Sequence, residues 1–145
     1  MRTVRDAEGQ RYLLIKRSGD SSRVRDPTTG EERYVPNADL EPATGESALE
    51  TAASAVPAEI RRVLTAVHDD RSLGLLVDLV DRGPTSVLEL LDAADLCESD
   101  LHGLLVEFRA AGLIREAEIG GRRGYEATDT AETAVAALRD RERSE

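Results

Sequence analysis

The sequence predicts an α+β protein in which a β-rich segment precedes a mainly helical domain that carries one hairpin. Three observations support this fold class: strand-like stretches separated by turn residues over the first forty residues, apolar residues at helical spacing from Pro57 onward, and a return to short strands near residues 113–128. We therefore predict an antiparallel β-meander over 1–40, a linker over 41–56, and a helical domain over 57–145.

The N-terminal segment contains two clear strand signals. Residues 11–17 are β-prone, and residues 23–25 and 32–35 flank a turn in which Pro27 presets φ and Gly30 permits positive φ. We expect a meander of three or four short strands. Because so small a sheet is unstable alone, it must pack on further chain or on a second subunit. In the linker, Ser47 followed by Glu50 is a capping pattern for one short helix.

Four helices are predicted between residues 57 and 112. Pro57 starts the first, Arg82-Gly83-Pro84 ends the second, and Ser86 with Glu89 caps a short third. A tight turn over 93–96 leads to the fourth, which Gly112 closes. The predicted inward positions are Ile60, Val63, Leu64 and Val67; Leu73, Leu76, Val77 and Val80; Val87, Leu90 and Leu91; and Leu101, Leu104, Leu105 and Phe108.

After Gly112 the spacing of apolar residues changes from a helical to a strand-like pattern. Residues 113–119 and 125–128 are strand-like and flank a predicted five-residue turn, Gly-Gly-Arg-Arg-Gly, over 120–124. A last helix is predicted over about 130–141, with Ala131, Ala134, Val135 and Leu138 facing inward.

This order of elements resembles the winged helix-turn-helix family of the ArsR and MarR types. The resemblance rests on SVLELLDAADLCESDLHGLLVEFRAAGLIRE for the helix-turn-helix and GGRRGYEATDTAETAVAAL for the wing and closing helix, and it covers about residues 70–138. It implies a DNA-binding transcriptional regulator that binds double-stranded DNA as a homodimer. The groove-facing positions that it implies are Glu98, Ser99, Asp100, His102, Gly103 and Val106, and its wing positions are Arg122 and Arg123.

These side chains have defined capacities toward DNA. Ser99 and His102 can form hydrogen bonds with bases or phosphates, Gly103 permits close approach, and Val106 can contact a thymine methyl group. Arg122 and Arg123 suit phosphates or the minor groove. Each also has a simpler interpretation as an exposed polar residue.

The charge distribution is unusual for a DNA-binding protein. The chain has 29 acidic residues, and its 19 basic residues include a single lysine; the whole net charge of −10 lies in residues 46–145. Acid excess and scarce lysine resemble the composition of haloarchaeal proteins, which work in molar salt. Because the screening length at 1 M salt is about 3 Å, repulsion between an acidic domain and DNA would be largely removed there.

Other function classes are less well supported. An enzyme is not expected, because the two histidines and Cys97 form no catalytic pattern and no phosphate loop, nucleophile elbow or HExxH motif is present. One cysteine excludes a thiolate zinc cluster, and neither a metal nor a cofactor is predicted. No apolar run approaches the roughly 20 residues that cross a bilayer, so we expect a cytoplasmic protein. The alternative function is a winged-helix protein-interaction or dimerisation module without sequence-specific DNA binding.

Overall fold

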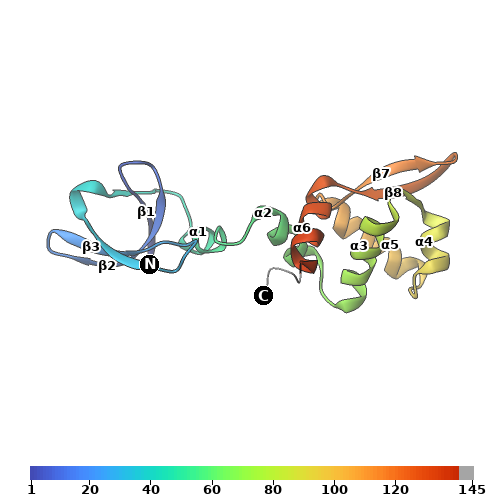
Figure 1. The fold of residues 1–145 in the computed structure, drawn as a ribbon, viewed down its shortest axis with the longest axis horizontal. Coiled ribbons are helices and arrows are strands. Elements are labelled where there is room, and N and C mark those ends of the chain that lie inside the picture. The colour runs from blue at the N-terminus through green and yellow to red at the C-terminus, as the bar shows by residue number, and fades with distance from the viewer. Residues whose placement is uncertain (141–145) are drawn as a thin grey trace. The chain divides into compact units, whose positions relative to one another are not determined.

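The computed structural model describes residues 1–140 and divides into two compact units. The first unit is Met1–Pro57, and the second begins at Ala58 (Figure 1). Within the described residues, no helix has both the length and the apolar character needed to span a membrane.

The first unit is a five-stranded antiparallel sheet with the order β4-β3-β2-β1-β5. Its elements are β1 (Arg2–Arg5), β2 (Arg11–Ser18), β3 (Ser21–Arg25), β4 (Glu32–Pro36), a 3₁₀ turn (Asn37–Asp39), β5 (Glu41–Pro42) and α1 (Ala48–Ala53). Strands β1 to β4 form the predicted meander, and β5 returns to pair with β1. A register shift between Leu14 and Lys16 bends β2.

The two faces of this sheet are covered differently. Helix α1 packs on β1 and β2, where the hydroxyl of Thr3 lies 2.7 Å from that of Thr51. Ser47 caps α1 by accepting a hydrogen bond from the Glu50 backbone N–H, as the sequence pattern predicts. Because successive strand residues alternate in side, Val4 lies on the opposite face, in a small core with the buried residues Tyr12, Val24 and Val35. The stretch 41–56 thus contributes β5 and α1 to the first unit.

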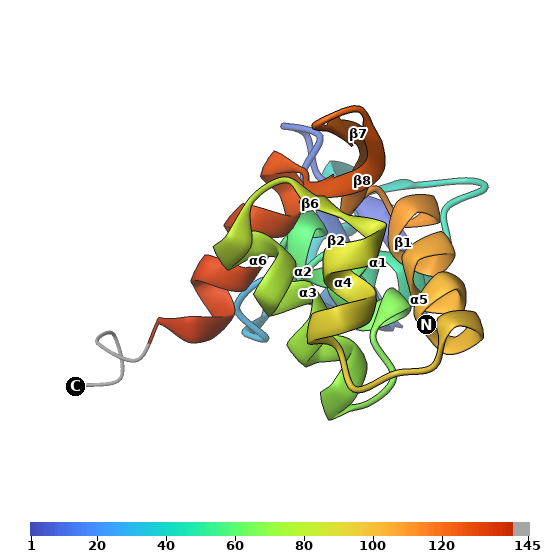
Figure 2. The ribbon, with the colours of Figure 1, turned by 90° about the vertical axis from the view of Figure 1, so that its right-hand side faces the viewer.

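The second unit has the order of elements that defines a winged helix-turn-helix. Its elements are α2 (Ala58–Ala66), α3 (Asp70–Arg82), β6 (Thr85–Ser86), α4 (Val87–Ala93), α5 (Glu98–Ala110), β7 (Ile114–Ile119), β8 (Arg122–Ala127) and α6 (Asp129–Arg139). Helices α4 and α5 are joined by a short turn, and the three strands pair in the order β6-β8-β7. Figure 2 shows α5 along the outside of the helical group. The predicted α+β fold class is confirmed.

A single aliphatic core joins the helices and the hairpin of the second unit. Its fully buried side chains include Leu76 and Leu79 of α3, Leu90 of α4, and Phe108 of α5. Gly112, at φ +75°, ends α5 in a Schellman motif, in which the Leu113 N–H donates to the Phe108 carbonyl. The chain therefore turns directly from α5 into β7 and buries Leu113 in the same core.

Two predicted core residues lie at the surface. Leu64 of α2 is 62% exposed and Leu138 of α6 is 50% exposed, although both fall on the apolar stripes of their helices. The prediction was wrong for these side chains, because α2 and α6 pack against each other through the smaller residues Val63, Ala66, Ala131 and Ala134, which are buried. Arg141, the last residue of the predicted final helix, lies outside the described residues.

Replacing Leu76 by alanine should lower the free energy of unfolding by about 2–5 kcal/mol, because the change leaves a cavity at a fully buried position. Urea denaturation followed by circular dichroism measures the effect. Leu88→Ala is the matched control, since this leucine is 52% exposed and should cost less than about 0.5 kcal/mol. Equal losses for the two variants would contradict the assigned core.

Candidate nucleic-acid interface

Helix α5 has one buried face and one open face. Leu101, Leu105 and Phe108 are buried in the core. On the open face, Ser99, His102 and Val106 are exposed, and Val106 is 54% exposed although it is apolar. Packing of the buried stripe therefore fixes the rotation of α5, and with it the set of side chains presented to solvent.

Gly103 lies in the middle of the open face. A Cβ atom built there meets no atom within 4 Å, and the backbone has ordinary helical φ. Nothing inside the described chain therefore requires glycine at this position, although glycine destabilises a helix interior by about 1 kcal/mol relative to alanine. Gly74 of α3 is in the same situation, so it serves as a matched position away from α5.

A hollow of about 810 Å³ lies between α4, α5 and strand β8. Ser99 and His102 of α5 line it together with Arg123 of β8. Its apolar lining comes from Val87, Leu91, Leu101, Leu105 and Tyr125. An adjoining hollow of about 430 Å³ brings His102 and Val106 of α5 together with the same arginine. The helix and the hairpin thus share one continuous open surface.

The tip of the β7–β8 hairpin is shorter than predicted. Gly120 and Gly121 alone connect the strands, and both have positive φ, as a two-residue hairpin turn of type I′ requires. Arg122 and Arg123 are consequently the first residues of β8 and pair with Ile119 and Glu118. Because strand residues alternate in side, the two arginines lie on opposite faces of the hairpin, which projects beyond the helices of its unit (Figure 1).

Gly124 places the hairpin against the helical group. A Cβ atom at this buried position would lie 2.4 Å from the Thr85 carbonyl oxygen and 2.9 Å from the Ser86 Cα. Only glycine therefore allows β8 to pair closely with β6, which directly precedes α4. The last glycine of the predicted turn acts in strand packing.

Arg123 is held on the α5 side of the hairpin by partners within the chain. Its Nη2 lies 3.0 Å from Glu116 Oε1 and 3.0 Å from the Tyr125 hydroxyl, and its guanidinium lies over the Tyr125 ring. The interaction with Tyr125, followed by that with Glu116, raises the pKa of Arg123. Glu116 also accepts a hydrogen bond of 2.8 Å from Arg109 of α5, so the same carboxylate links the helix to the wing.

Arg122 has no such partner. Among the described residues, its guanidinium makes no hydrogen bond, ion pair or ring contact. It lines a third hollow, on the hairpin, together with Arg123, Glu116 and Glu118. Arg122 is therefore the wing arginine that is available to a ligand without breaking an internal contact.

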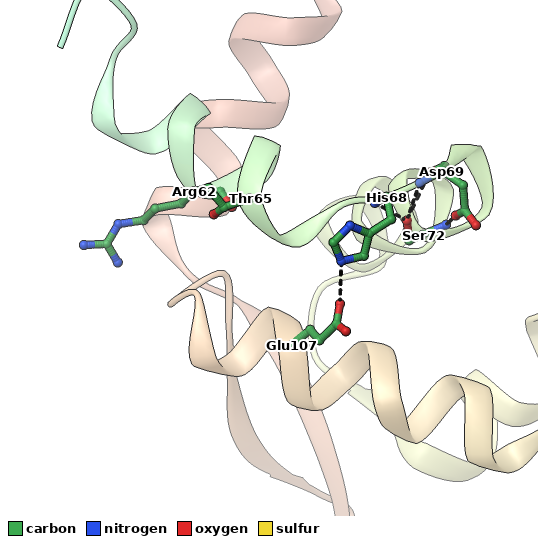
Figure 3. Close-up of polar contacts among 6 residues, drawn as sticks. All are labelled: Arg62, Thr65, His68, Asp69, Ser72 and Glu107. Carbon is green, nitrogen blue, oxygen red and sulfur yellow. Dashed lines mark hydrogen bonds and ion pairs between the residues drawn. The ribbon is translucent and has the colours of Figure 1, made fainter. Parts of the chain in front are cut away.

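Two polar contacts hold α5 from the α2 side. His68 Nε2 lies 3.1 Å from Glu107 Oε2 of α5 (Figure 3), and Arg62 Nη1 donates to the Ala111 carbonyl just beyond the end of α5. His68 lies immediately before the capping box of α3, in which Asp69 accepts a hydrogen bond from the Ser72 backbone N–H. That hydrogen bond is the main cause that lowers the pKa of Asp69.

The structure brings together some of the predicted site residues and separates others. Ser99, His102, Val106 and Arg123 line one or both of the two adjoining hollows, whereas Asp100 and Gly103 are exposed on α5 outside their linings. Arg122 lies on the opposite face of β8 by strand alternation, and it lines with Arg123 the third hollow on the hairpin. Sequence reasoning missed Arg109, Glu116 and Tyr125, which fix the helix relative to the wing. The only sequence signal for this network is the alternation that places residues 123 and 125 on one face of a strand.

The described residues contain no group of three or more histidine, cysteine or carboxylate side chains arranged to hold a metal ion. Cys97 is exposed at the N-cap of α5, and its Sγ lies 3.4 Å from the Ser99 hydroxyl.

Comparisons with known proteins give one family and several similar structures. The model of a family of unknown function, DUF7346, matches residues 1–139. None of the curated proteins matches the chain. Reduced HlyU from Vibrio cholerae N16961 is similar with a TM-score of 0.49 and 23% identity, over 62% of this chain and 90% of that chain. An ArsR-like transcriptional regulator from Rhodococcus sp. RHA1 is similar with a TM-score of 0.46 and 22% identity, over 60% of this chain and 81% of that chain.

Asp69→Asn should lower the thermal stability at pH 7, and the difference from the original protein should shrink in acid. The folded pKa of Asp69 lies below its ordinary value of 3.8, so the ionised side chain stabilises the fold above that value and loses this effect as the pH falls through the lowered pKa. Melting temperatures between pH 7 and pH 2 measure the difference. Asp92→Asn, at an exposed position of α4, is the control. A difference that persists unchanged to pH 2 would contradict the role of the charge.

Proposed function

The chain belongs to the DUF7346 family, and we propose that it is a cytoplasmic DNA-binding transcriptional regulator. In this proposal, α5 enters the major groove of double-stranded DNA and the β7–β8 hairpin lies along the neighbouring backbone. The match of the family model over residues 1–139 includes both units, so the first unit is part of the same regulator.

One observation carries the proposal: the face of α5 that the core does not need is open over its length. The major groove is about 12 Å wide and admits an α-helix. Ser99, His102 and Val106 supply hydrogen-bonding groups and an apolar contact on this face, and Asp100 can accept a hydrogen bond from a cytosine amino group. Gly103, which no internal contact explains, allows the helix axis to approach the base edges.

The wing arginines have different roles in this proposal. Arg122 has no partner among the described residues, so it can bind a phosphate at little internal cost. Arg123 already donates a hydrogen bond to Glu116. To bind a phosphate it must either break this hydrogen bond or bind the phosphate and the carboxylate at the same time. Phosphate contacts of this kind position a protein on DNA, and base contacts supply the specificity.

The acidic residues around α5 should make DNA binding stronger at high salt than at low salt, because salt screens their repulsion of DNA. Glu98, Asp100 and Glu107 are exposed on the helix, and none of them is neutralised by a lysine or arginine in the described structure. At low salt these carboxylates repel the phosphates of DNA. At molar salt the screening length is about 3 Å, so this repulsion is largely removed beyond contact distance. With the acidic composition of the chain, this supports a regulator that works in a cytoplasm of molar salt and depends on direct contacts.

Selection from a random duplex pool at 2 M KCl, followed by fluorescence anisotropy, tests the proposal. The full chain should enrich a defined sequence and bind it at 2 M KCl. Arg122→Ala should weaken binding by about 10-fold, the loss of one charged contact, and Gly103→Leu should abolish it, because the new side chain holds the helix away from the bases.

Each variant has a matched control. Gly74→Leu makes the same change on α3, where a Cβ also meets no atom within 4 Å, and Arg17→Ala removes the same charge in the first unit. Both should bind the selected duplex like the original protein. The proposal fails if no sequence is enriched at either 0.1 M or 2 M KCl. In that case, a double variant with Arg122→Ala and Arg123→Ala that still binds a protein partner would favour the alternative function, a protein-interaction module.

We also propose that the regulator is a homodimer whose interface includes α2 and α6. Leu64 and Leu138 are exposed leucines on these two packed helices, and a second copy that covers them removes apolar surface from water. A two-fold dimer would present two α5 helices to successive major grooves, about 34 Å apart, which is the usual way such domains bind symmetric sites.

Light scattering during size-exclusion chromatography should give twice the chain mass of 15.7 kDa for the original protein. Leu64→Glu should give the mass of one chain, because a charge in the interface would be desolvated without a partner. Leu88→Glu, at a similarly exposed leucine of α4, should remain dimeric. A single-chain mass for the original protein at micromolar concentration would contradict the homodimer.

A further inference from the structure

The first unit contains a cavity of about 270 Å³ on the sheet face opposite α1. Its apolar lining consists of Val4, Leu14, Leu40 and Pro42. Val4, Leu14 and Leu40 also belong to the small core of this unit, so the cavity is an open end of that core. A volume slightly below the usual range for ligand pockets suits a small organic molecule.

Two arginines beside this cavity have no partner. Arg2 and Arg17 line it, and among the described residues neither guanidinium makes a hydrogen bond, an ion pair or a ring contact. The other arginines of the first unit all have partners within it: Arg5 and Arg11 with Glu46, Arg23 and Arg25 with Glu32, and Arg33 with Tyr12. The two arginines of this unit without an internal partner thus both lie at this cavity.

The polar wall of the cavity is held in place before any ligand binds. Ser22, which is buried, donates a hydrogen bond to the Asn37 side-chain oxygen, and the Asn37 amide donates to the Gly19 carbonyl at 2.9 Å. Ser22 and Asn37 both line the cavity. A wall fixed in this way lowers the cost of ordering side chains when a ligand binds.

The charge of the lining favours an anion with a single negative charge. Guanidinium groups are planar forks that match carboxylates, with two parallel hydrogen bonds to one anion. Glu41 also lines the cavity, so the two arginines exceed the acid by one positive charge. A carboxylate neutralises this excess, whereas a doubly charged phosphate monoester leaves an unbalanced negative charge beside Glu41.

We propose that this cavity is a binding site for a small organic carboxylate with a short apolar body. Arg2 and Arg17 hold the carboxylate at the rim, and the apolar body packs on Val4, Leu14 and Leu40. The site belongs to the first unit alone, so it stands or falls independently of DNA binding by α5.

Titration of the ¹⁵N-labelled full chain with benzoate, followed by NMR, tests the site. Benzoate should cause saturable shifts at the amides of residues 2–4, 14–17 and 40–41, and benzyl alcohol, which has the same body without the charge, should not. Arg2→Gln and Arg17→Gln should each weaken benzoate binding by about 10-fold or more. Both variants should fold, because neither guanidinium has a partner to lose.

Lys16→Gln is the matched control, since it removes a positive charge next to Arg17 from a residue that does not line the cavity. Its benzoate affinity should be unchanged. The proposal is overturned if benzoate gives no saturable shifts, if the two arginine variants bind it as well as the Lys16→Gln variant does, or if phenyl phosphate binds more tightly than benzoate.

Discussion

Burial of one stripe of α5 is the constraint on which the rest of the second unit depends. Leu101, Leu105 and Phe108 pack into the core made with Leu76 and Leu79 of α3. A helix has only one rotation that buries all three side chains, so the positions on its opposite side must face outward. The open face of α5 is therefore a consequence of core packing, and its chemistry can differ from that of the core without loss of stability.

The wing depends on a second constraint, which is the close pairing of β8 with β6 at Gly124. This contact holds the hairpin beside α4. Glu116 of the hairpin then binds Arg109 of α5 as well as Arg123 of β8. Such exposed ion pairs contribute little to stability individually, but here they orient an arginine toward the surface it shares with α5. The second wing arginine, Arg122, lies on the other face of the strand and is left without a partner among the described residues.

Local patterns in the sequence predicted most of the fold, whereas contacts between distant elements could not be predicted. The stripe of α5, the caps at Ser47 and Ser86, and the closure at Gly112 depend on neighbours within a few residues. Leu64 and Leu138 were placed inward because periodicity identifies an apolar face but not whether the chain itself covers it. The two-residue turn at Gly120 and Gly121 depends on the register of β7 with β8. The strand role of Gly124 depends on β8 pairing with β6, a strand of two residues with no sequence signal of its own. The contact of Arg123 with Glu116 was not predictable because it depends on that register of β7 and β8.

We propose that the open face of α5 and the wing read DNA in the cell. Genome-wide crosslinking and immunoprecipitation of the tagged protein in its host measures this directly. DNA binding by a two-fold dimer should give discrete peaks that share a short motif with two-fold symmetry, which would match two helices spaced by one turn of the duplex. A profile without discrete peaks, from a protein that is expressed and folded, would contradict it and leave the winged helix as a surface for other proteins.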